Sequence, residues 1–143
     1  MPSLECKTAL LQKAKRIETL GTCKRAHLGN AARAATGFIT FVKKRIATMN
    51  PTPRFQELRS SYQYSESRGY PCVDAKITFD DTAAVTPTGN EQRKLQVISL
   101  YCRHPTQQDI GFFAAFSHRG KTIDEQLESP AKNFIEGINV PKK

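Results

Sequence analysis

Alternating apolar and polar residues predict a β-strand over residues 72–79 of this chain. A second run, residues 95–102, is rich in β-forming residues. A third run, residues 110–116, is apolar on both sides, as expected for an interior strand that is covered on two faces. Short links with turn residues join the three runs, so we expect an antiparallel meander. The turn residues between the first two runs are Asp80, Asp81, Pro87, Gly89 and Asn90.

The chain on either side of these runs adds one strand and one helix. Residues 54–69 fit both a helix and a strand, and we interpret residues 60–66 as a short strand that precedes the meander. Ser129 and Pro130 form the pair expected of an N-cap followed by the first helical residue. This helix should lie across the sheet, followed by a tail over residues 139–143. Its apolar side consists of Leu127, Ala131, Phe134, Ile135 and Ile138.

Apolar residues at helical spacing predict two further helices in the first fifty residues. We place the first over residues 4–20, with Gly21 and Thr22 as its stop. The second starts near Asn30 and ends before Pro51, which cannot continue a helix.

The predicted fold class is α+β, with an antiparallel β meander of three to four strands packed against a C-terminal helix and two N-terminal helices. By length we expect a single domain, residues 1–143. Within it, residues 1–50 form a basic helical part and residues 54–143 form a β-rich body with its closing helix. One core is expected where this helix covers the sheet. Its predicted members are Ile77, Val97, Phe112, Phe116 and Phe134.

The cysteines permit one geometric prediction. If the hairpin between the first two runs is symmetric about Pro87, Asp80 pairs with Lys94 and Cys72 pairs with Cys102. Directly opposed residues on antiparallel strands have Cα atoms roughly 4.5–5.5 Å apart, which a disulfide accepts. The pair is therefore either a disulfide or two ordinary buried cysteines.

The cysteines also bear on the cellular compartment. A disulfide between Cys72 and Cys102 implies a periplasmic or secreted protein, and its absence implies a cytoplasmic one. Cys6 and Cys23 are free thiols or pair with one another, and the sequence leaves this open. The amino terminus shows no secretory-signal pattern, and no apolar run approaches the roughly 18 residues that cross a membrane. We therefore expect no membrane span.

The net charge of +9 is concentrated in the first part of the chain. Residues 1–60 contain 12 basic and three acidic residues, whereas residues 61–143 contain ten of each. The basic residues are either the solvated faces of two amphipathic helices or a polyanion-binding surface. We expect weak, non-specific nucleic-acid binding. The candidate residues are Lys24, Arg25, Arg33, Lys43, Lys44 and Arg45.

Candidate chemistry is confined to one polar cluster. The sequence has no glycine-rich phosphate loop and no Cys-x-x-Cys, His-Glu-x-x-His or Gly-x-Ser-x-Gly motif. In the predicted register, Tyr70, Cys102, Arg103 and His104 meet at one end of the sheet. His104 shares a face with Cys102 and could activate its thiol, whereas Arg103 points to the other face. A metal site would use Cys72, Cys102 and His104 but has no fourth ligand, so we predict neither a metal nor a cofactor.

The absence of catalytic motifs favours a small non-catalytic α+β domain that binds another protein or a small ligand, and that is exported if the disulfide forms. A second copy of the chain is an alternative partner. Another function would be binding of nucleic acid or another polyanion through the basic N-terminal helices. The last alternative is a cysteine-dependent enzyme that uses Cys102 and His104.

Overall fold

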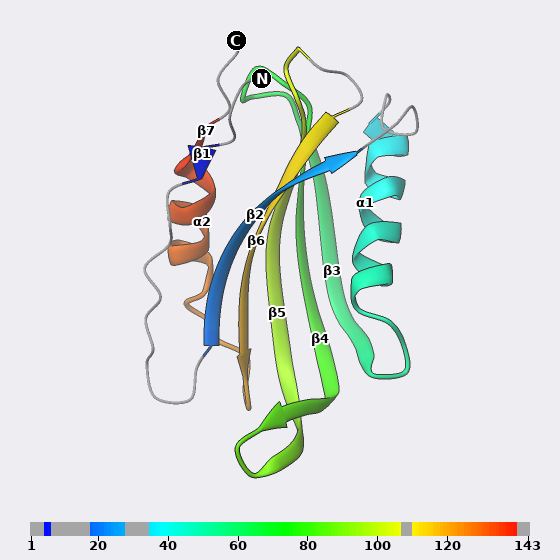
Figure 1. The fold of residues 1–143 in the computed structure, drawn as a ribbon, viewed down its shortest axis with the longest axis vertical. Helices are drawn as coiled ribbons and strands as arrows, with labels where there is room; N and C mark the ends of the chain where they lie inside the picture. Colours follow the sequence, from blue (N-terminus) through cyan, green and yellow to red (C-terminus); the bar gives the residue numbers. More distant parts are fainter. Residues whose placement is uncertain (1–4, 7–17, 28–34, 107–109, 140–143) are drawn as a thin grey trace.

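The structure, a computed structural model, describes residues 5–6, 18–27, 35–106 and 110–139. The elements are β1 (Glu5–Cys6), β2 (Glu18–His27), α1 (Ala35–Met49), β3 (Phe55–Ser65), β4 (Cys72–Thr86), β5 (Gly89–Arg103), β6 (Ile110–Gly120), α2 (Glu128–Glu136) and β7 (Ile138–Asn139). Five strands form an antiparallel sheet in the order β2-β6-β5-β4-β3. One helix packs on each face of this sheet, so the molecule has three layers (Figure 1).

The four consecutive strands β3 to β6 form the predicted antiparallel meander. The predicted register is confirmed, because Cys72 lies opposite Cys102 and Asp80 lies opposite Lys94. Because side chains alternate between the two faces of a sheet, this register fixes which residues of β4 and β5 face α1 and which face α2.

The hairpin between β4 and β5 is longer than predicted because its turn is confined to Pro87 and Thr88. Gly89 follows with a φ of 118°, in the left-handed region that favours glycine. Asp80 and Asp81, which we predicted as turn residues, belong instead to β4. A register shift just after Asp81 bends the hairpin, whose tip projects beyond the rest of the sheet (Figure 1).

β3 resolves the ambiguity of residues 54–69 in favour of a strand. It starts at Phe55, earlier than the predicted 60, because Phe55 is buried with its ring centroid 6.1 Å from that of Phe79. The register shifts between Glu57 and Arg59, so Leu58 is the extra residue of a β-bulge.

β2 shows that the predicted helix over residues 4–20 is wrong where the chain is described. Residues 5–6 form β1 and residues 18–20 belong to β2, while residues 7–17 lie outside the described part. The cause is tertiary, because β2 pairs with β6 along its whole length, from Glu18 opposite Arg119 onward. Satisfying the backbone groups of that edge outweighs a weak helical periodicity. The described residues thus contain one N-terminal helix instead of two.

α1 confirms the second predicted helix from Ala35 onward. Phe38, Val42 and Ile46 recur at a spacing of four residues and are buried against the sheet. The helix ends at Met49, and Pro51 follows soon after.

The hydrophobic residues form two cores, so our prediction of a single core is wrong. Ile77 and Val97 pack with α1, whereas Phe112, Phe116 and Phe134 pack on the side of α2. The ring centroids of Phe116 and Phe134 are 5.7 Å apart. Neighbouring strand residues point to opposite faces, and each face has its own helix. We call these faces the α1 face and the α2 face.

α2 starts at Glu128, one position before the predicted N-cap Ser129, so Pro130 falls within its first turn. Proline is tolerated there because the first turn has unpaired N–H groups. The five apolar residues predicted for this helix are all buried. Asn139, which we assigned to a tail, belongs to β7 and pairs with Glu5 of β1.

Candidate functional site

A groove lies on the α2 face of the sheet, where α2 packs mainly over β5 and β6. Its volume is about 440 Å³. It is lined by residues 59–61 of β3, 76–78 of β4, 96–98 of β5 and the segment that leads into α2. The groove therefore occupies the part of the sheet beside α2, next to the edge strand β3.

The bulge at Leu58 decides which side chain of β3 faces this groove. Glu57 is opposite Phe79, whose side chain packs on the α1 face. In a regular strand Arg59 would share that face, but the extra residue places Arg59 opposite Thr78 instead. Bulges commonly re-aim side chains in this way. The guanidinium of Arg59 is thereby brought to the groove on the α2 face.

The groove has two sides, which we call its banks: the strands form one, and the segment before α2 forms the other, the far bank. Gln96 of β5 holds the far bank in place. The side-chain amide of Gln96 donates to the carbonyl oxygen of Asp124 at 3.1 Å, and its oxygen accepts the Asp124 backbone N–H at 2.8 Å. The carboxylate of Asp124 accepts the backbone N–H of Gln126 at 2.9 Å. These bonds fix the segment before α2 against the sheet.

An ion pair joins the two banks. Lys76 Nζ of β4 lies 2.9 Å from Glu128 Oε1 at the start of α2. The hydrogen bond and the charge of Lys76 lower the pKa of Glu128. Both side chains are largely exposed, at 51% and 73%, so water and salt weaken their attraction. A ligand could displace this pair at little cost.

Arg59 is the open cation of the groove. Of the two cations in the lining, Lys76 pairs with Glu128, whereas the Arg59 guanidinium makes no hydrogen bond or ion pair with any described residue. A guanidinium presents donors in a fixed planar arrangement that matches a carboxylate or phosphate group. The groove can therefore accept an anionic group beside β3.

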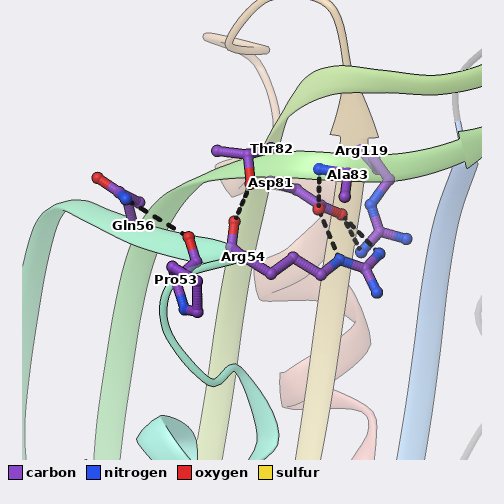
Figure 2. Close-up of polar contacts among 7 residues, drawn as sticks. All are labelled: Pro53, Arg54, Gln56, Asp81, Thr82, Ala83 and Arg119. Atoms are coloured by element: carbon purple, nitrogen blue, oxygen red, sulfur yellow. Dashed lines mark hydrogen bonds and ion pairs between the residues drawn. The ribbon is translucent and has the colours of Figure 1, made fainter.

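Asp81 is the centre of a buried hydrogen-bond network, and sequence reasoning missed it (Figure 2). Its carboxylate is fully buried and accepts hydrogen bonds from Arg54 Nε at 2.8 Å, Arg54 Nη2 at 3.1 Å and the Ala83 backbone N–H at 3.2 Å. Arg119 Nη2 lies 3.2 Å from the same carboxylate. The signal in the sequence was the acidic pair Asp80-Asp81, which we interpreted as part of a turn.

The hydrogen bonds and the ion pair around Asp81 have a structural role. Burial alone would raise its pKa, but the hydrogen bonds of Arg54 and Ala83, with the charge of Arg119, outweigh burial and lower the pKa. Thr82 adds a backbone and a hydroxyl hydrogen bond to the carbonyl oxygen of Arg54, each 3.0 Å long (Figure 2). The cluster therefore ties the residue that precedes β3 to β4 and β6, and its carboxylate is already occupied by protein donors.

The predicted cluster of Tyr70, Cys102, Arg103 and His104 is only partly assembled. Tyr70 and Cys102 are buried in the core on the α2 face. Arg103 follows Cys102 on the strand and points to the other face, where its charge acts on Tyr64. His104 Nδ1 accepts the backbone N–H of Thr106 at 3.1 Å.

The sulfur atoms of Cys72 and Cys102 are 2.13 Å apart, which is disulfide distance. A sulfur in a disulfide carries no thiolate, so this arrangement gives no support to a nucleophilic or metal-binding role for Cys102. The described residues include no group of three His, Cys, Asp or Glu residues that could hold a metal ion. The pairing of Cys6 and Cys23 concerns side chains outside the described part of the structure.

The predicted polyanion-binding residues are divided between two elements. Lys24 and Arg25 belong to β2 and not to a helix. Lys43, Lys44 and Arg45 are exposed on α1, where consecutive residues point in directions about 100° apart. Lys43 Nζ lies 5.1 Å from the ring centroid of Tyr62 in β3. Arg33, the remaining candidate, lies outside the described residues.

His118 of β6 is a buried titratable group beside the groove segment. Its side chain is 2% exposed, and neither ring nitrogen has a hydrogen-bond partner among the described residues. Gly120 leaves room for the ring, because a Cβ at this glycine would lie 3.1 Å from His118 Cε1. Burial lowers the pKa of His118, and the charge of Asp124 opposes this only in part.

This burial predicts a loss of stability in mild acid. Because the pKa of His118 is lower in the folded state, the unfolded state binds more protons below about pH 6.5. The free energy of unfolding should therefore fall as the pH drops from about 7 to 5, by at most about 1.4 kcal/mol per pH unit. Urea unfolding across this range should show a flatter dependence for His118→Gln. His104→Gln is the matched control, and parallel curves for wild type and His118→Gln would contradict the assignment.

The chain matches no family model, and comparison with curated proteins finds no match. No helix in the described ranges is long and apolar enough to cross a membrane.

Proposed function

We propose that this protein is a small non-catalytic binding domain that takes a segment of a partner protein into the groove on the α2 face. The observation that carries the proposal is Arg59, which the bulge of β3 brings to a groove with a fixed far bank and whose guanidinium pairs with no acid among the described residues. Polar groups on both banks can bind a peptide, and the exposed pair of Lys76 and Glu128 can exchange partners.

The nature of the groove favours a protein segment over a small molecule. Sites for small ligands are mostly apolar cavities that enclose most of the ligand. This groove instead carries charged groups on both banks, Arg59 and Lys76 on the strands and Asp124 and Glu128 on the other side. It also adjoins the edge strand β3, where a partner chain has access.

An oxidising compartment is part of the proposal. Sulfur atoms at disulfide distance support it, because disulfides persist in secreted and periplasmic proteins and are rare in the cytosol. The domain would then meet its partner outside the reducing cytoplasm.

A photoreactive amino acid at Glu125 tests the proposed groove. Glu125 lines the groove from the segment before α2 and is exposed, so irradiation of cells that produce the protein should give one discrete cross-linked product, identified by mass spectrometry. The same amino acid at Asn90, an exposed residue near the tip of the β4–β5 hairpin, is the control and should give none. No product at Glu125, or the same products at both positions, would contradict the proposal.

Polyanion binding remains the second candidate function. One observation favours it: α1 has no acidic residue, and Lys43, Lys44 and Arg45 are all exposed on it. Because these three residues point in different directions, we expect the binding to be weak and strongly dependent on salt.

A further inference from the structure

β3 is an edge strand whose outer side is open along most of its length. It ends the sheet order, with β4 on one side and no strand on the other among the described residues. The backbone hydrogen bonds formed outside helices and sheet ladders include none from residues 56–65 in the described ranges. Every second residue of this stretch therefore directs its N–H and C=O groups outward, where another strand could pair with them.

The protection typical of edge strands is concentrated at one end of β3. Natural edges are commonly protected by bulges and charged side chains. Here the bulge at Leu58 and the charges of Glu57 and Arg59 lie together near the start of the strand. The remaining stretch, residues 60–65, is uncharged and unbulged. It is about 20 Å long at the usual rise of about 3.3 Å per residue.

Cations flank this stretch on both faces of the sheet. Arg59 lies on the α2 face at the groove, and Lys43 of α1 lies over Tyr62 on the α1 face. β3 has no carboxylate between Glu57 and Glu66. Asp74 is the nearby acid, opposite Gln63 on β4, and burial raises its pKa while the charges of Arg68 and Lys76 act against this. Glu57 and Glu66 lie at the two ends of the stretch, where burial and their charges raise the pKa of Tyr62 and Tyr64. Between these two ends, the cations Arg59 and Lys43 can attract an acidic side chain on an added strand.

From this edge and these charges we infer that β3 accepts an extended acidic segment of a partner protein by strand addition. The inference rests on the proposed binding function and names the chemical class of the partner. Backbone pairing would provide the attachment, and carboxylates would provide the selectivity. Arg59 and Tyr62 are three residues apart and face opposite sides, so acids three residues apart on the added strand would meet Arg59 and Lys43.

A capped octapeptide of threonine and valine, with two glutamates three residues apart, is the probe for this inference. Fluorescence anisotropy should detect its binding to the intact protein. Hydrogen exchange followed by NMR should show new protection of backbone amides within residues 56–65. A peptide with lysine in place of glutamate should bind at least about tenfold more weakly, because it replaces two attractive pairs by two repulsive ones. Full N-methylation of the glutamate peptide should abolish binding, since it keeps the charge but removes the N–H donors.

Protein variants separate the local charge from the general charge of the protein. Arg59→Gln should weaken binding of the glutamate peptide about two- to fivefold, the effect of one cross-strand charge pair. Lys121→Gln removes an exposed cation elsewhere and should leave binding unchanged. Equal loss in both variants would overturn the assignment of Arg59, because general charge would then explain the attraction.

The remaining outcomes decide between the inference and the proposed function. Equal binding of the N-methylated peptide would overturn strand addition, and equal binding of the lysine peptide would overturn the acidic preference. Displacement of the peptide by a short DNA duplex at about 0.15 M salt would assign the edge to polyanions instead. If the peptide fails to bind but the Glu125 cross-link forms, the groove proposal stands and this inference fails. If the peptide binds and the cross-link is absent, the groove proposal fails and the open edge remains.

Discussion

Replacing Cys72 and Cys102 together by alanine is expected to lower the free energy of unfolding by about 3–4 kcal/mol. The two residues are 30 positions apart in sequence. A bond between them closes this loop and so reduces the number of conformations that the unfolded chain can adopt. The loss should appear as a lower midpoint in urea unfolding under oxidising conditions. It is a large part of the roughly 5–15 kcal/mol that stabilises a typical domain.

Reduced wild-type protein is the matched control for this prediction. It keeps both sulfur atoms in the core on the α2 face, so it separates loss of the bond from loss of packing. Mass spectrometry of a non-reduced digest should link the peptide of Cys72 to that of Cys102. Free thiols at both positions, or a loss within about 0.5 kcal/mol, would contradict the prediction.

Phe134→Ala is expected to cost about 3–5 kcal/mol of stability. Phe134 is 6% exposed and lies against Phe116, so truncation would leave a cavity between α2 and the sheet. Chemical unfolding of the variant measures this cost. The matched control is Val85→Ala, where the side chain is 81% exposed, and it should change stability by no more than about 0.5 kcal/mol.

The presence of two separate cores allows a second test of this prediction. Phe38 lies in the core on the α1 face, on the opposite side of the sheet from Phe134. Losses caused by Phe38→Leu and Phe134→Leu should therefore add to within about 0.5 kcal/mol in the double variant. Strong coupling would show that the two cores do not behave separately. A loss within about 0.5 kcal/mol for Phe134→Ala would show that α2 is not docked there.

Local patterns were sufficient to predict the central strands, the register and α1. The register followed from a turn at Pro87, because a short hairpin connection fixes every pair along its two strands. Phe38, Val42 and Ile46 likewise identified one face of α1 at helical spacing. These features depend on residues close together in sequence or on a single turn.

The features that the sequence did not reveal depend on distant contacts. β2 is a strand because the edge of β6 requires a partner, which no pattern within residues 18–27 announces. Asp81 resembled a turn residue because its partners, Arg54 and Arg119, lie far away in the chain. The candidate groove depends on the bulge at Leu58 and on the position of α2, and no local glycine or proline indicates that bulge.

The pairing of β2 with β6 also constrains the order of folding. Glu18 pairs with Arg119, so β2, although it is made early, cannot join the sheet until β6 has been synthesised. Long-range pairings of this kind form slowly, because a large loop must close before any contact is gained. Until then β6 presents an unpaired edge that includes Phe112, Phe113 and Ala114, a template for pairing with other chains. The newly made protein is consequently most prone to aggregation between completion of the β3–β6 meander and arrival of β2.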